Sequence, residues 1–321
     1  MSPQGGPGPT GGGGDALGWL DAVVLGLVEG LTEFLPVSST GHLIVAQRAL
    51  GLPAGAAENA FAVGIQMGAI TAILVLYWRR LWDALRTILR PVEGRRNLLL
   101  QIAVAAFPAA LLGLLCDDWI DRHLFSTRVV AATLLIGGVL LLWLERWLAG
   151  REPTLAGLPA MSYRAAPAIG LWQRLPLVPG TSRPGATIGG ALLLGLSRTA
   201  AAEFSFLVGL PILYGASVYK LVAARDALTA EMWQPLAIGT VVSFVAALAV
   251  VQPFVTFVRR HSFAPFAWYR IVAGAVLFVL LAVGWLEWTG GGEDLSRAGS
   301  PAAARSAAPR SSSGTAGRAA S

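Results

Sequence analysis

Several side chains able to do chemistry lie close together near the start of an otherwise apolar chain. Glu29 and Glu33 are four residues apart, so on a helix both carboxylates project from one face. Ser39 and His42 follow after a proline, at a spacing of one helical turn. A nucleophile, a base and an orienting acid are the parts of a covalent or acid–base catalyst. We therefore predict catalytic roles for Glu33, Ser39 and His42, and we expect Glu29 and Glu33 to bind a cation or to handle a proton.

The same stretch predicts a broken helical element. Pro36 should end one helix, and the hydroxyls of Ser38 and Thr40 can cap the next. The free N–H groups and the positive dipole end of that second helix make a seat for an anion. Ser38 and Thr40 are therefore candidate phosphate-binding residues, although capping alone would also explain them. A helix, a break and a second helix in a short apolar run indicate a re-entrant hairpin.

A second stretch repeats this design. Residues 170–188 align without gaps on residues 26–44, which predicts an internal duplication. Arg183 lies where the second hairpin turns, and its planar fork suits phosphate oxygens while Ser182 and nearby N–H groups surround them. A structural arginine that binds helix carbonyls is the alternative. Gln66 lies inside an apolar run, where it could be an interhelical tie or a phosphate-site residue.

Composition places the chain in the membrane. Of its 321 residues 55% are hydrophobic and only 13% are charged, and the mean hydropathy is +0.63. These values predict an all-α polytopic membrane protein. The net charge of +6 does not indicate a nucleic-acid partner, because the arginines fall between apolar runs and are typical of cytoplasmic loops. With Cys116 as the single cysteine, no intramolecular disulfide can form.

The apolar runs predict six full membrane spans. We expect a single membrane domain over 16–289, with tails at 1–15 and 290–321 that lack the composition to fold. Each half, about 16–149 and about 160–289, should hold one re-entrant hairpin followed by three spans. The odd number of crossings inverts the second half relative to the first. The expected spans lie near 59–78, 98–116, 126–147, 203–223, 233–257 and 268–288.

Charge also predicts sidedness. The segment 79–97 is rich in arginine and should be a cytoplasmic loop, whereas the acidic segment 117–121 should connect two spans on the outside. The first hairpin lies one span before the arginine-rich segment, so it should open to the outer face. Both termini should lie on that face as well.

At these residues the sequence resembles the undecaprenyl-diphosphate phosphatase family of bacterial membrane enzymes. The resemblance is carried by residues 29–42 (EGLTEFLPVSSTGH), by 179–187 (PGTSRPGAT) and by Ser197-Arg198 with 203–206 (EFSF), and it extends from about residue 17 to 287. It implies hydrolysis of the C55 lipid diphosphate, which recycles the carrier of cell-wall polymers. It also implies a divalent cation, and by motif position it implies functional roles for Glu29, Glu33, Ser39, His42 and Arg183. We expect the cation, Mg²⁺ or Ca²⁺, near Glu29 and Glu33, and phosphate contacts from Arg183. Pro184 departs from the family, which usually has serine there.

Alternatives remain at this point. The nucleophile could be Ser39, His42 or water. A transporter or flippase of a polyprenyl phosphate lipid would use the same broken-helix architecture. An acid-phosphatase-type lipid phosphatase fits less well, since neither His123 nor His261 has an arginine six residues earlier. We expect membrane lipids as surroundings, and a homodimer is left open.

Overall fold

The computed structural model describes residues 17–52, 56–89, 96–124, 126–225 and 229–286. Six helices in this described part are long and apolar enough to cross a membrane, three in each half of the chain, which confirms the predicted all-α polytopic class. The predicted tails, 1–15 and 290–321, lie outside the described residues. The six helices are α3 (Ala56–Leu76), α5 (Leu98–His123), α6 (Thr127–Leu148), α9 (Arg198–Ala223), α10 (Trp233–Arg260) and α11 (Ala264–Ala282).

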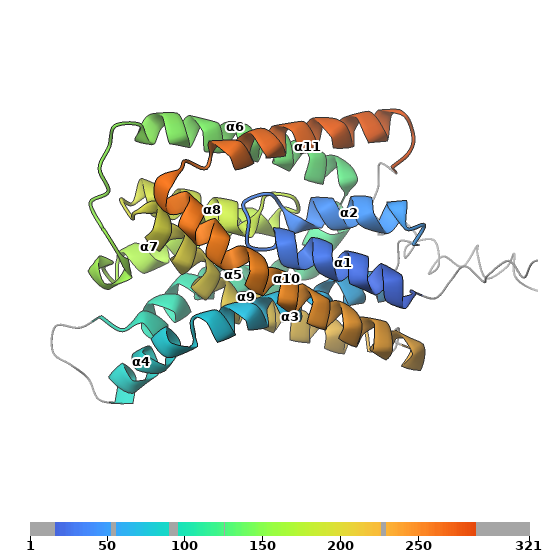
Figure 1. The fold of residues 1–321 in the computed structure, drawn as a ribbon, viewed down its shortest axis with the longest axis horizontal. Coiled ribbons are helices and arrows are strands. Elements are labelled where there is room, and N and C mark those ends of the chain that lie inside the picture. Colours follow the sequence, from blue (N-terminus) through green and yellow to red (C-terminus); the bar gives the residue numbers. More distant parts are fainter. Residues whose placement is uncertain (1–16, 53–55, 90–95, 125, 226–228, 287–321) are drawn as a thin grey trace, which may run out of the picture.

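Two pairs of shorter helices lie where the sequence predicts the two hairpins, and their re-entrance into a membrane stays a prediction. The first pair is α1 (Trp19–Thr32) and α2 (Ser39–Ala49), and the second is α7 (Ala165–Trp172) and α8 (Arg183–Leu193), with a short 3₁₀ turn at Leu175–Leu177. The break expected at Pro36 is confirmed, because it lies in the loop between α1 and α2. In Figure 1 this loop lies beside the start of α8, so the tips of the two hairpins meet.

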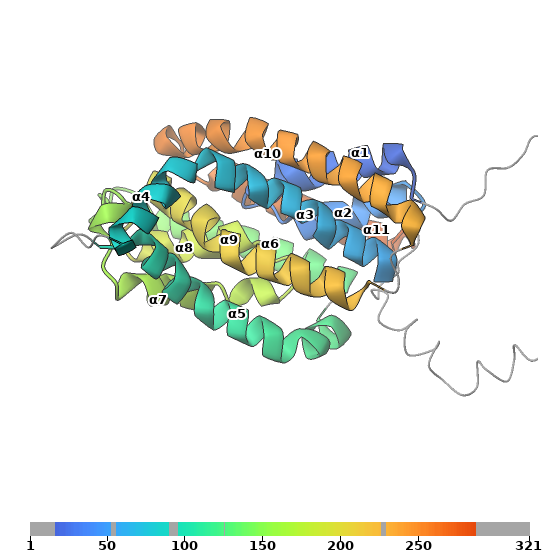
Figure 2. The same cartoon turned by 90° about the horizontal axis from the view of Figure 1, so that it is seen from below.

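Each hairpin packs on a span from the other half of the chain. Helix α1 lies along α10, and α7 lies along α5, on opposite sides of the α3–α9 pair (Figure 2). Glycines allow the close approach: a Cβ on Gly30 would overlap the Ser243 carbonyl, and one on Gly170 would overlap that of Ala105. Helices α6 and α11 pack together as a further pair (Figure 1). These pairings are those that two related halves would make, and the inversion itself stays a prediction.

Two segments differ from the expectation. The arginine-rich segment predicted as a loop contains helix α4 (Trp78–Leu89), which runs outward from the bundle in Figure 1. Its apolar residues recur at helical spacing, as Trp78, Leu81, Trp82 and Leu85, with arginines on the other side, so it suits a membrane interface. Helix α5 likewise continues to His123, through the acidic segment predicted as a connection.

Candidate active site

The first hairpin brings a hydroxyl and a carboxylate into direct contact. Ser39 Oγ donates a hydrogen bond to Glu33 Oε2 at 2.7 Å. Glu33 closes α1 and Ser39 opens α2, so the short loop between the helices is what joins them. Glu33 is only 5% exposed, so little water competes for its oxygens. The pair therefore has the geometry of a nucleophile with its general base.

Arg183 connects this pair to the second hairpin. Its Nη2 lies 3.5 Å from Glu33 Oε1, and its Nη1 donates to the Ser205 carbonyl at 2.7 Å. Gly209, one turn along α9 from Ser205, leaves room for the guanidinium, since a Cβ there would overlap Nη1. The buried Nε has no partner in the described residues. Arg183 thus orients the carboxylate and keeps a donor free for another oxygen.

Glu29 and Gln66 extend the polar cluster. Glu29 is 1% exposed. Its carboxylate lies beside the Glu33 carboxylate and the side-chain amide of Gln66 on α3. Glu29 Oε1 has no hydrogen-bond donor among the described residues. A bound cation or a proton would satisfy such an oxygen. The described part of the chain holds no group of three or more His, Cys, Asp or Glu suited to a metal, so a cation here would need amide, water or substrate oxygens as well.

Two helix N-termini face the cluster. Ser38 and Ser182 precede α2 and α8, and with φ of 70° and 68° they are the two described non-glycine residues with positive φ. Ser182 Oγ accepts a hydrogen bond from the N–H of Gly185 at 3.2 Å. Thr40 is half-buried in the first turn of α2, and Pro184 fits the first turn of α8. Such strained caps with free N–H groups suit an anion.

His42 contacts other groups than Ser39, the partner that its spacing predicts. Its Nδ1 lies 2.7 Å from the carbonyl of Ser38, so Nδ1 carries a hydrogen there. Its Nε2 is 2.5 Å from the hydroxyl of Tyr269 on α11, whose ring stacks on the imidazole. In neutral His42, Tyr269 is then the donor and Nε2 the acceptor. Ser39 is hydrogen-bonded to Glu33, and no bond joins it to His42 in the structure.

Sequence reasoning missed Tyr269 and Arg270. Arg270 is 1% exposed and donates to carbonyls of both hairpin loops. The sequence does hold a signal for Arg270, because an arginine inside an apolar span is rare unless it has a function. No local pattern pointed to Tyr269, since it meets His42 only through the packing of α11.

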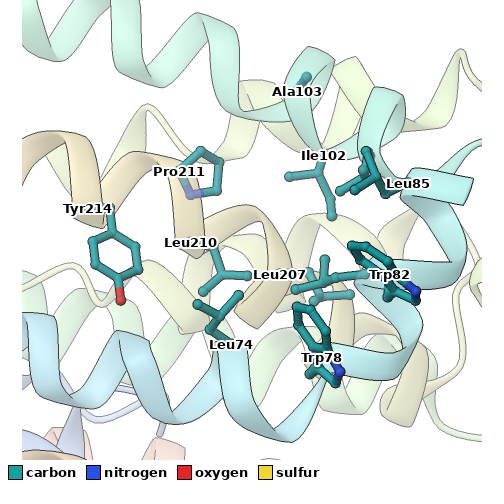
Figure 3. Close-up of a pocket in the computed structure, with 12 residues that line it drawn as sticks. Leu74, Trp78, Trp82, Leu85, Ile102, Ala103, Leu207, Leu210, Pro211 and Tyr214 are labelled. Carbon is teal, nitrogen blue, oxygen red and sulfur yellow. The ribbon is translucent and has the colours of Figure 1, made fainter. Parts of the chain in front are cut away.

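A separate apolar cavity lies away from these residues. It measures about 560 Å³ and lies between α3, α4, α5 and α9 (Figure 3). Its walls include Trp78, Trp82, Leu207 and Pro211, and it contains none of the predicted site residues. Such walls suit hydrocarbon and offer little to a phosphate, whereas the polar groups described above lie at the hairpin tips.

Comparison with known proteins gives one consistent family. The family model described as bacitracin resistance protein BacA matches residues 22–276. Undecaprenyl-diphosphatase 1 of Acinetobacter baylyi is 41% identical over 277 residues, which cover 85% of this chain and 100% of that protein. Undecaprenyl-diphosphatase of Novosphingobium aromaticivorans is 46% identical over 269 residues, which cover 83% of this chain and 97% of that protein. Undecaprenyl-diphosphatase of Verminephrobacter eiseniae is 44% identical over 270 residues, which cover 83% of this chain and 96% of that protein.

Proposed function

Because this chain belongs to the bacitracin resistance protein BacA family, we propose that it hydrolyses undecaprenyl diphosphate to undecaprenyl phosphate and inorganic phosphate. The observation that carries the proposal is the buried chain of contacts from Ser39 through Glu33 to Arg183. It joins a hydroxyl, a base and a phosphate-binding cation at the meeting point of two helix N-termini. Recycling of the lipid carrier for cell-wall synthesis follows from this activity.

The geometry favours Ser39 as the nucleophile. Glu33 takes the hydroxyl proton as Ser39 Oγ bonds to the terminal phosphorus, and the bond from that phosphorus to the bridging oxygen breaks. The proton passes from Glu33 to the departing lipid monophosphate. Water then attacks the phosphorus of the phosphoserine while Glu33 takes a proton from it, and the bond from phosphorus to Ser39 Oγ breaks. Glu33 returns the proton to Ser39 Oγ, and inorganic phosphate is released. Arg183 and the N–H groups at the starts of α2 and α8 hold the phosphate oxygens throughout.

We further propose that a divalent cation, Mg²⁺ or Ca²⁺, binds at Glu29 and Glu33 with Gln66 close by. The donor set fits, because these are hard oxygen ligands and Glu29 Oε1 lacks a donor. When bound, the cation would offset negative charge on the diphosphate. Ser38, Thr40 and Ser182 would contact the phosphates from the two caps.

The site should open to the outer face of the membrane. This rests on the arginine-rich segment around α4, which favours the cytoplasmic side. In a Cys116→Ala background, Asn59→Cys should react with a membrane-impermeant thiol reagent in intact cells, whereas Asp83→Cys should not. Both positions are exposed. The reverse labelling pattern would overturn the orientation.

Phosphate release from undecaprenyl diphosphate by the purified protein tests the activity. We expect release that a chelator abolishes and that added Mg²⁺ or Ca²⁺ restores. Arg198→Lys, in an ion pair with Glu145 away from the hairpin tips, serves as an active control. Absence of release with any metal, together with movement of polyprenyl phosphate across vesicles, would instead support the transporter.

A further inference from the structure

Arg270 lies between the two hairpin tips and binds both. From α11 its Nη1 donates to the carbonyl of Pro36 at 3.4 Å, and its Nη2 donates to that of Gly180 at 3.3 Å. Nη2 also donates to the carbonyl of Thr133 on α6 at 3.0 Å. One guanidinium therefore joins the first hairpin loop, the second hairpin loop and a membrane span.

The surroundings form a fitted seat for this guanidinium. Gly137, one turn after Thr133 on α6, packs against it, and a Cβ there would overlap Nη2. A Cβ on Gly185, in the first turn of α8, would lie 3.3 Å from Nη1. Thr133 Oγ1 adds a second tie to the same loop by donating to the Pro179 carbonyl at 2.8 Å. A side chain at position 137 would therefore displace the guanidinium, whereas one at position 185 would only crowd it.

The charge of Arg270 is not neutralised by an ion pair. The salt bridges found in the described residues involve Arg80, Arg86, Arg183 and Arg198, and none involves Arg270. A buried cation without a carboxylate is costly, and an apolar residue would usually give a more stable core. Because a Cβ on Gly185 would lie 3.3 Å from Nη1, this charge lies beside the start of α8, where we place the phosphate site.

We propose that Arg270 is a positioning residue for the hydrolysis, a role that rests on the proposed function. Its guanidinium fixes the two hairpin loops relative to each other, so that Ser39 and Glu33 from the first meet Arg183 from the second. Its charge also favours the bound diphosphate without touching the reacting atoms. The first effect acts on turnover, because a displacement of about 1 Å between reacting groups costs about a hundredfold in rate. The second acts on substrate binding.

Two substitutions separate the two effects. Arg270→Lys keeps the charge but replaces the planar fork by one ammonium, which cannot reach three carbonyls, so kcat should fall about a hundredfold with little change in KM. Arg270→Gln removes the charge as well, so KM should also rise, by about tenfold. Arg198→Lys is the matched control, a like change at an arginine remote from the tips, and should keep both constants near wild type.

A second pair of variants covers the case in which Arg270 variants fail to fold. Gly137→Ala keeps Arg270 and favours the helix but pushes on Nη2, so kcat should fall about tenfold. Gly113→Ala is its control, since a Cβ there would lie 3.6 Å from Leu177, an ordinary contact. Folding is checked by thermal unfolding in detergent.

The outcomes distinguish this proposal from the activity itself. If wild-type protein releases no phosphate, the proposed function fails. If wild type is active and folded Arg270→Lys and Gly137→Ala keep wild-type kcat, the positioning role is overturned. A fall in kcat that matches an equal fall in Arg198→Lys or Gly113→Ala would also overturn it, since a general loss of stability would then explain the effect.

Discussion

The two hairpins share a backbone design but carry different chemistry. Each breaks in a short loop, each loop ends on a serine with φ near 70°, and a short helix starts at the next residue. Ser39 opens α2 in the first hairpin, and Arg183 occupies the matching position of α8. The first tip therefore holds a hydroxyl bonded to a carboxylate, and the second holds an arginine that contacts the same carboxylate. The predicted duplication would allow such a division, because either tip alone would lack half of these contacts.

The buried polar residues of the first helices differ in the same way. Glu29 in the first hairpin lies beside Glu33 and Gln66. Gln173 has the matching place in the second hairpin, and both polar atoms of its amide are buried without a partner. The Glu29 carboxylate faces other polar groups and suits a ligand, whereas the Gln173 amide makes no hydrogen bond to the described residues. The comparison predicts that substitutions in the first tip affect chemistry most, and that position 173 matters least.

Ser39→Ala should have the largest effect. Removing the nucleophile leaves binding and electrostatic stabilisation in place, so kcat should fall by about a thousandfold or more while the protein still folds. Initial rates of phosphate release measure this, with Thr87→Ala as a control, since it removes a hydroxyl on α4 that is not part of the proposed site. If Ser39→Ala retained activity within about tenfold of wild type, water or His42 would become the nucleophile.

Arg183→Lys tests the contribution of the second tip. The ammonium cannot contact Glu33, the Ser205 carbonyl and a phosphate oxygen together, so kcat/KM should fall about a hundredfold. Steady-state kinetics with the lipid diphosphate check the value, and thermal unfolding checks the fold. Turnover near wild type in this variant would reduce Arg183 to a structural role.

Glu29→Gln should have a smaller effect, centred on the metal. Replacing one anionic oxygen weakens the binding of a hard cation. The Mg²⁺ or Ca²⁺ concentration that gives half-maximal activity should therefore rise about tenfold. Saturating metal should restore most of the rate. An unchanged midpoint, also in Glu33→Gln, would remove both carboxylates from the metal site and leave proton transfer as their role.

The sequence predicted the spans and the hairpins because their signals are local. Apolar runs of span length and the break at Pro36 are readable from neighbouring residues alone. The sequence does not predict helix α4, because the arginines of this segment indicate a loop and mask the helical spacing of Trp78, Leu81 and Trp82. An amphipathic interface helix is recognised only when its apolar face and the arginines of its polar face are considered together.

The sequence singles out residues that the structure brings together, but it predicts their contacts less well. Glu33, Ser39 and Arg183 do come together, since two broken helices must place their tips side by side. The pairing of His42 with Tyr269 depends on how α11 packs on the hairpin, more than two hundred residues later in the chain. Short spacing could suggest His42 as a partner of Ser39, but only tertiary packing decides which groups meet.

Gln173→Leu should have the smallest effect on activity, and its effect on stability should be favourable. The amide of Gln173 is 3% exposed and makes no hydrogen bond in the described structure, so its burial costs free energy that leucine would not. We expect unchanged kcat and KM, with stability higher by about 1 kcal/mol, measured by thermal unfolding in detergent. A marked loss of turnover with the fold intact would contradict the comparison of the two hairpins. It would mean that the second hairpin, like the first, uses its buried polar residue in the reaction.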